Sequence, residues 1–583
     1  MEPNKTPQYD AVMDQILLNL VPHVRQCTWA GKHDHCENEF NITDEDIEFL
    51  KLLRVPPPNY CPTCRRIRRL AFMGSNRFFK RSCSATNHTE MMISILPQEC
   101  PFPVYDYLYF ISDEFDPFMF SASFQDEVSP MQTLLSLRRI FPMPSFLNRD
   151  SLSINSEYTN GGRNLKNGYY AFGCFDSEDV RYSNLILKSK DIGDSRAIRH
   201  SQFVYNSLAS DYLYKSSYIY FSTHIVESMF LFDCRNCDYC FGCVNLRNKK
   251  YCVFNEQLTK DEYEMFIKNL YPLSRDTLRE YEKKFWDLIR ILPMNASHNI
   301  GSKNVSGVGI VNCEDVYDSV DSDKSQHTRY ADGAMSHKDS MDILFSGGHS
   351  HNLYNTTNVG SQSSNVKFSV SSKFCTDSEF VFNSKNLSNC FMCFGLQNKS
   401  YCILNTQYEP EEYFKIVDKI KTKMINDGEY GDGLGFAFSA QPYNFSSAGS
   451  TYPLSDEQIK DLGGYSLNDP ETNAENMVIL EKEEIPKTIE DVTDDILNKA
   501  IRCEVTGRPF RIVAPELEFY RTMNIPLPTV HPTPRMRVFA DLKPTSKKYK
   551  TTCRRCKNVI DSMLNPKQDF VLYCEKCYQQ EVI

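Results

Sequence analysis

Hydrophobic and polar positions alternate in short blocks through the middle of the chain. Residues 151–240 and 300–390 are rich in Ser, Asn, Asp, Tyr and Phe and lack apolar positions at helical spacing. Units of the type Asp/Asn-x-x-x-Ser, such as Asp179–Ser183 and Asp191–Ser195, recur about every 10 to 12 residues between β-prone runs. Evenly spaced short strands predict a β-solenoid in which two units make one coil of roughly 20 to 24 residues. A β-sandwich with regular turns is the alternative.

The central region contains a duplication. Residues 240–263 align with residues 390–413 at an offset of 150, with 12 of 24 positions identical. A stretch with apolar residues near helical spacing follows each copy, at Asp261–Leu270 and Glu411–Met424. The pattern therefore predicts two solenoid units, each followed by a helical segment.

A second duplication relates the two ends of the chain at an offset of 470. The matches over some fifty positions need no gap and include Phe40 with Phe510, Glu48 with Glu518, Pro62 with Pro532, Arg65 with Arg535 and Cys83 with Cys553. Chance does not readily produce such a series, so the ends are interpreted as two copies of one module.

The C-terminal copy carries a strong zinc-ribbon pattern. Its spacing is Cys553-x2-Cys556-x17-Cys574-x2-Cys577. A tight turn lets both thiolates of one Cys-x-x-Cys pair reach the same ion, and the second pair completes a tetrahedron. Four thiolates leave no open position, so we expect structural zinc rather than a catalytic ion.

The N-terminal copy carries a related pattern, His33-x2-Cys36-x24-Cys61-x2-Cys64. The knuckle spacing selects His33 as the first ligand, and the offset of 470 places His33 on Cys503. One histidine and three cysteines suit structural zinc. Cys27 or His35 in place of His33 is the alternative that the spacing leaves open.

Each copy has kept one of two ligand sets. The C-terminal counterparts of the first set are Cys503, Thr506, His531 and Pro534, and threonine and proline do not bind zinc. In the N-terminal copy, Cys83-x2-Thr86 has lost half of a knuckle. We therefore expect two Zn2+ ions rather than four.

The expected fold class is mainly β: two right-handed parallel β-solenoid-like units with short helical segments, flanked by related zinc-ribbon modules at both ends. The predicted order is an N-terminal zinc-ribbon module (1–100), a connector (101–150), a first solenoid unit (151–257), a helical segment (258–299), a second solenoid unit (300–407), a helix (408–426), a flexible acidic linker (427–490) and a C-terminal zinc-ribbon module (491–583).

Several runs of the sequence resemble a known family. The run CPTCRRIRRLAF, the run CEVTGRPFRI, the ending YCEKCYQQEVI and the repeated LRNKKYCVFN element are similar to an uncharacterised zinc-ribbon and β-solenoid family of candidate-phylum bacteria. The resemblance covers nearly the whole chain. It implies the same fold, and it supplies no catalytic residues.

Clusters of basic residues lie beside the zinc ligands. Residues 61–81 contain seven Lys and Arg and no acid, and residues 535–557 contain nine against Asp541. Arginines can contact phosphates and aromatic rings can stack on bases, so these clusters predict nucleic-acid or ribonucleoprotein binding. The candidate residues are Arg65, Arg66, Arg68, Arg69, Arg77, Lys80, Arg81, Lys547, Lys548, Lys550, Arg554 and Arg555. Acidic protein surfaces, including the acidic linker of the same chain, are alternative partners.

Two further patterns have structural explanations. Cys234, Cys237, Cys240 and Cys243 have the spacing of a ferredoxin-type run, but the second copy replaces the first two with Ser384 and Leu387, which favours stacked core cysteines. Carboxylates such as Asp176, Glu178 and Asp179, or Asp318, Asp321 and Asp323, would suit a carbohydrate-active enzyme, yet turn aspartates are commoner.

The remaining features narrow the class of protein. No P-loop, nucleophile elbow, zincin helix or dinucleotide fingerprint is present. No apolar run approaches the length of a membrane span, and the N-terminal residues lack a signal-peptide pattern. The 22 cysteines without a secretory signal indicate a reducing, cytoplasmic compartment. We expect a non-enzymatic binding or scaffold protein whose two terminal modules pack on each other. A structural protein without nucleic acid and a carbohydrate-active β-solenoid enzyme are the alternatives.

Overall fold

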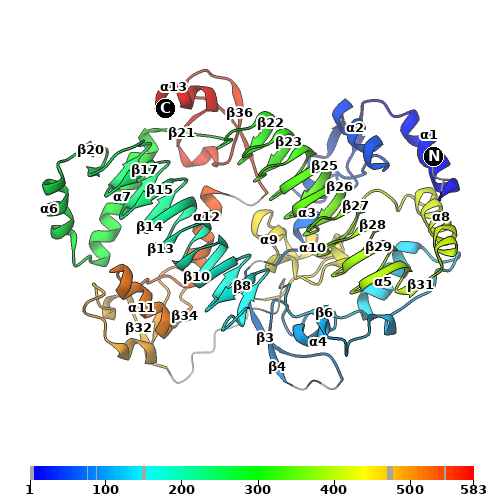
Figure 1. Cartoon of the computed structure of the whole chain (residues 1–583), viewed down its shortest axis with the longest axis horizontal. Helices are drawn as coiled ribbons and strands as arrows, with labels where there is room; N and C mark the ends of the chain where they lie inside the picture. Colours follow the sequence, from blue (N-terminus) through cyan, green and yellow to red (C-terminus); the bar gives the residue numbers. More distant parts are fainter. Residues whose placement is uncertain are drawn as a thin grey trace. The chain divides into compact units, whose positions relative to one another are not determined.

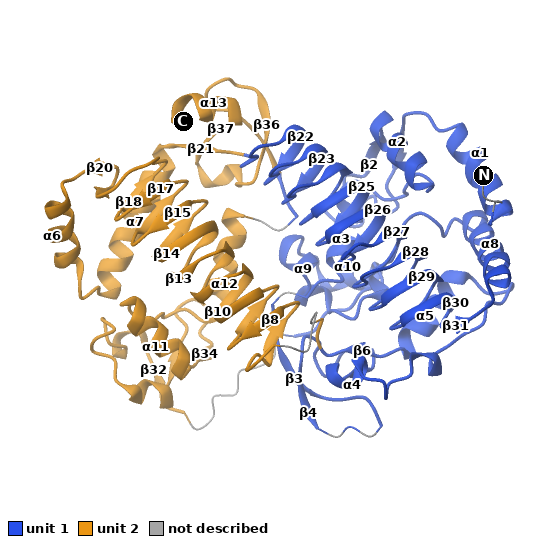
Figure 2. Ribbon diagram, viewed as in Figure 1, with its two compact units in different colours: residues 1–145, 297–468, 545–548 blue, residues 146–296, 469–544, 549–583 orange. Residues whose placement is uncertain are grey.

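A computed structural model describes residues 5–74, 76–86, 88, 90–147, 153–468, 477–543 and 546–582 (Figure 1). The chain divides into two compact units (Figure 2). Unit 1 comprises residues 1–145, 297–468 and 545–548, and unit 2 comprises residues 146–296, 469–544 and 549–583. The N-terminal module therefore shares a unit with the second repetitive region, and the C-terminal module shares a unit with the first. The two units thus bring together segments that are far apart in the expected linear series, and the individual domain boundaries stay predictions.

Unit 2 is built on one large sheet whose long ladders are parallel. Its strands are β7 (Tyr158–Asn160), β8 (Arg163–Lys166), β9 (Tyr169–Phe172), β10 (Phe175–Leu187), β11 (Lys190–Gly193), β12 (Arg196–Arg199), β13 (Gln202–Tyr205), β14 (Leu208–Tyr220), β15 (Thr223–Val226), β16 (Met229–Phe232), β17 (Arg235–Asp238), β18 (Phe241–Val244), β19 (Cys252–Val253) and β20 (Glu256–Gln257). Within the described residues, only the terminal pair, β19 with β20, is antiparallel in this sheet.

Unit 1 is built on a similar sheet of ten strands. They are β22 (Lys303–Val308), β23 (Glu314–Val320), β24 (Gln326–Arg329), β25 (Met335–Leu344), β26 (Gly347–Thr357), β27 (Ser364–Lys367), β28 (Thr376–Glu379), β29 (Lys385–Phe391), β30 (Gln397–Ile403) and β31 (Thr406–Gln407). Strands make up 33% and helices 27% of the structure, so the mainly β expectation holds with a large helical contribution.

Most strands of the parallel ladders pair at the same step along the sequence. Lys190 pairs with Gln202, which pairs with Tyr214, and the same step of 12 relates Thr376 to Ser388 in unit 1. We call each strand-bearing turn of the chain that pairs with the next one a rung. At a step of 12, each Asp/Asn-x-x-x-Ser unit carries the chain from one rung to the next. The expected two-unit period is therefore wrong: one unit, not two, separates paired strands.

Backbone conformation explains the composition of these regions. From Asn164 to Phe254, every third residue has a positive φ, near +50° at Asp176, Asp179 and Asp191. Asn and Asp adopt this left-handed conformation more readily than most residues. The chain thus bends four times between one rung and the next, and a residue that tolerates positive φ is needed at each bend.

Serine hydroxyls tie successive rungs together. The Ser177 hydroxyl donates to the Phe175 carbonyl (2.7 Å) and accepts from the backbone N–H of Ser189 (3.1 Å). Ser189 repeats both bonds with Leu187 and Ser201. The serines lie at positions that alternate with buried aliphatic residues such as Ile186 and Ile192. Buried polar side chains must be hydrogen-bonded, and this ladder satisfies them.

The four regularly spaced cysteines occupy the same interior positions. Cys234, Cys237, Cys240 and Cys243 are fully buried, and each thiol donates to a carbonyl two positions earlier, at 3.3–3.5 Å. The backbone N–H of Leu246 donates to Cys234 as it would to a serine hydroxyl (3.4 Å). These thiols therefore extend the serine ladder, and within the described ranges they do not form a metal-binding group.

Two rungs of unit 1 contain one extra residue. Met335 pairs with Gly347, but His337 pairs with Ser350 and His351 with Ser364, a step of 13. Removing these two insertions lowers the offset between the two sheets from 150 to 148 for β23 to β25, whereas β22 begins one residue out of step, with Lys303 paired to Glu314. Positions 164 and 312, for example, then occupy equivalent places.

Helices cover part of each sheet. In unit 2, α6 (Lys260–Leu270) and α7 (Arg275–Ile291) lie within the predicted helical segment, and α7 packs against β16 and β18 with Phe285 and Ile289 buried. In unit 1, α8 (Pro410–Asn426) packs against β30 and against α1 (Pro7–Leu18).

The segment predicted as a flexible linker is folded in its first part. Residues 427–468 include η2 (Phe436–Phe438), η3 (Tyr443–Phe445), α9 (Ser447–Thr451) and α10 (Asp456–Asp461). Tyr430, Phe436, Tyr443 and Phe445 are buried, which fixes this Gly/Ser-rich chain to unit 1. The predicted connector likewise contains β5 (Val104–Tyr105), α4 (Tyr107–Ile111), η1 (Pro117–Met119), α5 (Pro130–Ile140) and β6 (Met143–Pro144).

Each terminal module contains two β-hairpins and short helices. The N-terminal elements are β1 (His23–Gln26), β2 (Glu39–Ile42), α2 (Asp44–Leu53), α3 (Pro62–Leu70), β3 (Phe79–Ser82) and β4 (Met91–Ser94). The C-terminal elements are β33 (Ala500–Arg502), β34 (Pro509–Phe510), α11 (Ala514–Met523), α12 (Pro532–Leu542), β35 (Tyr549–Thr552), β36 (Val559–Ser562), β37 (Val571–Tyr573) and α13 (Glu575–Val582). β32 (Ile479–Leu480) pairs with β33, and β21 (Pro293–Asn295) pairs with β37. The matching element orders agree with the duplication.

Candidate metal centres and the residues beside them

Four cysteines converge in the N-terminal module. Cys27, Cys36, Cys61 and Cys64 place their sulfur atoms within 4.8 Å of one another. Cys27 directly follows β1, while Cys61 caps α3 and Cys64 lies in its first turn. The backbone N–H of Cys61 donates to the Cys27 sulfur (3.3 Å), and that of Cys64 donates to the Cys61 sulfur (3.4 Å). Such bonds favour thiolates, the form that binds zinc.

The first ligand differs from the one the spacing selected. Cys27 completes the group in place of His33, because the β1–β2 hairpin holds Cys27 through a bond from its N–H to the Asn38 carbonyl (2.7 Å). Cys27 and Cys36 thus form a Cys-x8-Cys pair rather than a Cys-x2-Cys knuckle. His33 is buried with its Nε2 3.4 Å from the Cys64 sulfur, and the half-buried His35 contacts the Pro453 carbonyl (3.1 Å).

Zinc stoichiometry separates the two ligand sets. We expect Cys27→Ser to lower the zinc content of the purified protein from about two equivalents to about one, because it removes a direct ligand. His33→Ala should retain about two equivalents, because it removes only a hydrogen-bonding neighbour of Cys64. Metal analysis by mass spectrometry measures both. The opposite result, loss with His33→Ala and retention with Cys27→Ser, would restore His33 as the ligand.

The C-terminal module assembles the four predicted cysteines. Cys553, Cys556, Cys574 and Cys577 form the second group, built from the β35–β36 hairpin and the start of α13. The N–H of Cys574 donates to the Cys553 sulfur (3.3 Å), as Cys61 does to Cys27. Burial opposes the charge on Cys553, but the N–H groups of Cys574 and Cys556 lower its pKa to about 6. Four thiolates at tetrahedral reach fit structural Zn2+.

Each module also contains one further cysteine whose sulfur accepts a hydrogen bond from a backbone N–H. The N–H of His531 donates to the Cys503 sulfur (3.2 Å), and the N–H of Asp106 donates to the Cys83 sulfur (3.3 Å). Asp106 therefore takes the place of Cys574, two positions beyond the one that the offset of 470 gives. Because of this shift, an alignment without gaps does not match Asp106 with Cys574. Within the described residues, neither Cys503 nor Cys83 belongs to a metal-binding group.

The arginines that follow Cys64 are buried rather than exposed. Arg65 and Arg69 both pair with Asp342 of β25, at 2.8 and 2.9 Å, and Arg66 pairs with Asp332 at 2.7 Å. Burial disfavours the charge on Arg65, but Asp342 raises its pKa above the usual value. These three side chains cannot reach a phosphate, so their predicted contact with nucleic acid is wrong: they fasten α3 to the sheet of unit 1.

Three of the other N-terminal candidates are also engaged inside unit 1. Arg68 donates to the Gly433 carbonyl (3.0 Å) and lies over the Tyr60 ring (4.0 Å). Arg81 is buried and donates to the Pro97 carbonyl (2.7 Å), and Arg77 lies over Phe445 (4.3 Å). Of the seven predicted residues in this module, Lys80 is the one that is exposed.

The C-terminal candidates are more accessible. Lys550, Arg554 and Arg555 are exposed around the zinc knuckle, although Lys550 pairs with Asp561 (2.7 Å) and Arg555 with Glu581 (3.2 Å). Lys548 pairs with Asp318 (2.9 Å), and Lys547 lies over Tyr452 (5.5 Å). The exposed Lys557, which the prediction omitted, belongs to the same knuckle.

Unit 2 repeats the buried ion pair of unit 1. Arg535, the counterpart of Arg65, is buried against Asp194 and Glu516, and its guanidinium lies over Tyr182 (5.1 Å). In unit 1 the Arg65 guanidinium lies over Tyr330 at 4.9 Å. The offset of 148 between the two sheets relates Asp194 to Asp342 and Tyr182 to Tyr330. The same contact between module and sheet therefore occurs in both units.

Comparison with known proteins adds no relative: no family model, curated protein or solved structure matches the chain. Among the described helices, none combines the length and apolar character required to cross a membrane.

Proposed function

We propose that this protein is a non-enzymatic binding scaffold in which zinc-ribbon modules clamp two right-handed β-solenoids. The observation that carries the proposal is that the metal-binding cysteines and the contact with the sheet lie on the same helix. Cys61 and Cys64 stand at the start of α3, and the next residue, Arg65, pairs with Asp342 of the sheet. The parallel register, with one repeat unit per rung, supports a solenoid, and parallel crossovers are right-handed in nearly all proteins. Contact between the two terminal modules stays a prediction.

Two half-buried carboxylates on the sheet of unit 2, Asp176 and Glu178, do not suit the acid role in the carbohydrate-active alternative. Asp176 accepts from Asn164 (3.1 Å) and Arg163 (3.0 Å), and these contacts lower its pKa. Lys166 likewise lowers the pKa of Glu178. A glycosidase needs one carboxylic acid with a raised pKa to protonate the leaving group. Neither residue has the required environment.

Metal content and metal removal test the scaffold proposal. The full-length protein should contain about two equivalents of zinc, and a strong chelator should make it sensitive to limited proteolysis in both units, because each clamp depends on a four-cysteine site. Restoring zinc should restore resistance. A protein that contains no zinc, or that resists protease equally with and without chelator, would contradict the proposal.

Nucleic-acid binding by the zinc modules is a second candidate function, now limited to one end. The exposed Lys550, Arg554 and Arg555 favour it, because Arg554 and Arg555 lie within the knuckle itself. Replacement of these two arginines by alanine provides a direct comparison with the surface considered next.

A further inference from the structure

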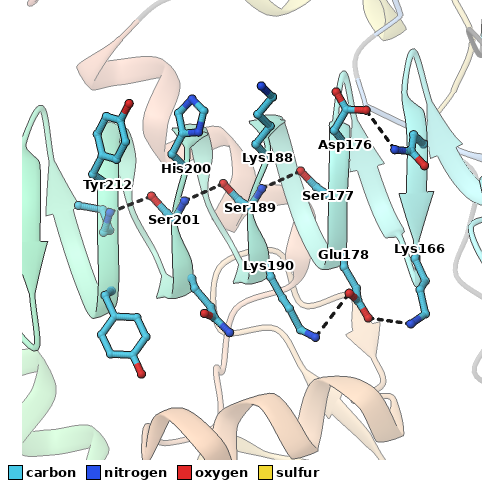
Figure 3. Close-up of a pocket in the computed structure, with 14 residues that line it drawn as sticks. Lys166, Asp176, Ser177, Glu178, Lys188, Ser189, Lys190, His200, Ser201 and Tyr212 are labelled. Atoms are coloured by element: carbon cyan, nitrogen blue, oxygen red, sulfur yellow. Dashed lines mark hydrogen bonds and ion pairs between the residues drawn. The ribbon is translucent and has the colours of Figure 1, made fainter.

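One face of the unit 2 sheet forms a shallow hollow. The residues that line this hollow all belong to strands of the sheet or to the turns between them. The hollow has a volume of about 890 Å³ and follows β8, β10, β11, β13 and β14 (Figure 3). Two columns of outward side chains line it, and each column advances by one rung of the ladder at a time. One column contains Asn164, Asp176, Lys188, His200 and Tyr212, and the other contains Lys166, Glu178, Lys190, Gln202 and Tyr214.

The charged part of this face has an excess of lysine. Lys166 (2.8 Å) and Lys190 (3.4 Å) share the carboxylate of Glu178. Lys188 lines the same hollow, and its charge helps to lower the pKa of Asp176. Three lysines against two acids make the face basic, whereas the whole chain has a net charge of −10. A local basic surface on an acidic protein attracts anions.

Aromatic rings continue the face beyond the lysines. His200 stacks on Tyr212 with centroids 5.1 Å apart, and Tyr212 stacks on His224 at 4.6 Å. Tyr212 is 49% and Tyr214 40% exposed. His200 and His224 cover the two faces of the Tyr212 ring, so the outer edge of this column and the neighbouring Tyr214 are the aromatic surfaces that a planar, anionic ligand can contact beside the lysines.

Unit 1 has a hollow at the equivalent place. Its volume is about 720 Å³, and its outward residues include Lys303, Lys324, Lys338, His349 and His351, with Glu314 as the acid. Lys324 and Lys338 are the counterparts of Asp176 and Lys190 at the offset of 148 that also relates Asp342 to Asp194. The same face is therefore open and basic in both units, although the individual side chains differ.

We propose that these two faces bind single-stranded nucleic acid, with phosphates at the lysines and bases against the exposed rings. Basic grooves with stacking rings are how proteins hold single strands without reading sequence. The rungs repeat every ~4.8 Å, so Lys166 lies about 10 Å along the sheet from the rung of Lys188 and Lys190, and the rungs with the rings follow in the same direction. The proposal deepens the scaffold function and rests on it. It places binding on the solenoid faces rather than on the zinc modules.

A binding assay with three variants tests the proposal. Fluorescence anisotropy of a labelled 20-nucleotide oligo-U should show binding by the full-length protein that weakens as salt rises. Combining Lys188→Ala, Lys190→Ala, Lys324→Ala and Lys338→Ala should weaken binding about tenfold or more and reduce the salt dependence. Tyr214→Ala should weaken it roughly fivefold or more, with less change in salt dependence.

The third variant combines Arg554→Ala and Arg555→Ala and tests the zinc module instead. The matched control combines Lys283→Ala and Lys284→Ala, two exposed lysines of α7 that line neither hollow, and should leave the affinity within about twofold. The proposal is overturned if the arginine variant abolishes binding while the lysine variant does not, or if the wild type does not bind oligo-U. It is also overturned if the wild type binds only an acidic polysaccharide such as polygalacturonate. Zinc content and the melting curve, measured on every variant, show whether the scaffold itself is intact, so failure of this proposal differs from failure of the proposed function.

Discussion

Cys64→Ser should lower the melting temperature of unit 1 by on the order of 10 °C and remove about one zinc equivalent. Cys64 is fully buried in the first turn of α3, one residue before Arg65. Structural zinc contributes roughly 10–16 kcal/mol to the folding of isolated zinc-finger peptides, so partial loss of this term is a large change. Calorimetry of wild type and variant, together with metal analysis, measures the effect.

Cys556→Ser provides the matched comparison. Cys556 belongs to the C-terminal group and is exposed, so its replacement should also remove about one equivalent of zinc but spare the unit 1 transition. A Cys64→Ser protein that melts within about 2 °C of the wild type would show that zinc does not stabilise the N-terminal clamp.

Asp342→Asn should destabilise unit 1 by about 3–5 kcal/mol. Asp342 is fully buried and pairs with both Arg65 and Arg69, which are 2% and 3% exposed. The amide leaves two buried guanidinium groups without their carboxylate, and an uncompensated buried charge is costly. Asp194→Asn should have a smaller effect in unit 2, because Arg535 keeps its second carboxylate, Glu516. Urea denaturation measures both changes.

An exposed pair supplies the control. Asp238 pairs with Lys250 at 2.8 Å, and the lysine side chain is 61% exposed. Exposed pairs contribute about 0–1 kcal/mol, so Asp238→Asn should change stability by less than about 1 kcal/mol. An Asp342→Asn variant that is no less stable than this control would mean that the arginines do not depend on Asp342.

The repeats and the second metal site could be predicted from sequence because their signals are local. Cys553 and Cys577 lie in two short knuckles, and the Asp/Asn-x-x-x-Ser units mark each rung. The number of units per rung could not be predicted, because the sequence of one unit does not show which other unit its strand pairs with. The conformation that sets the period, positive φ at every third residue, includes residues such as Tyr170 and Leu185 that give no turn signal in a sequence.

The arginines show a different limit. A run of basic residues without acids predicts a charged surface when only neighbours in sequence are considered. The acid that pairs with Arg65 lies 277 residues away, and only the folded chain brings Asp342 beneath α3. Cys27 was likewise set aside because its spacing from Cys36 is not that of a knuckle, whereas the β1–β2 hairpin absorbs the inserted residues.

The grouping of the units also bears on how the protein is made. Unit 2 joins residues 146–296 to residues 549–583, so its sheet leaves the ribosome long before the cysteines that clamp it. At about 5–20 residues per second, this interval lasts tens of seconds. During translation the sheet of unit 2 would therefore depend on its own serine ladder for stability. In unit 1 the order is reversed: the N-terminal module is synthesised first, and its arginines gain their partners only when Asp332 and Asp342 follow.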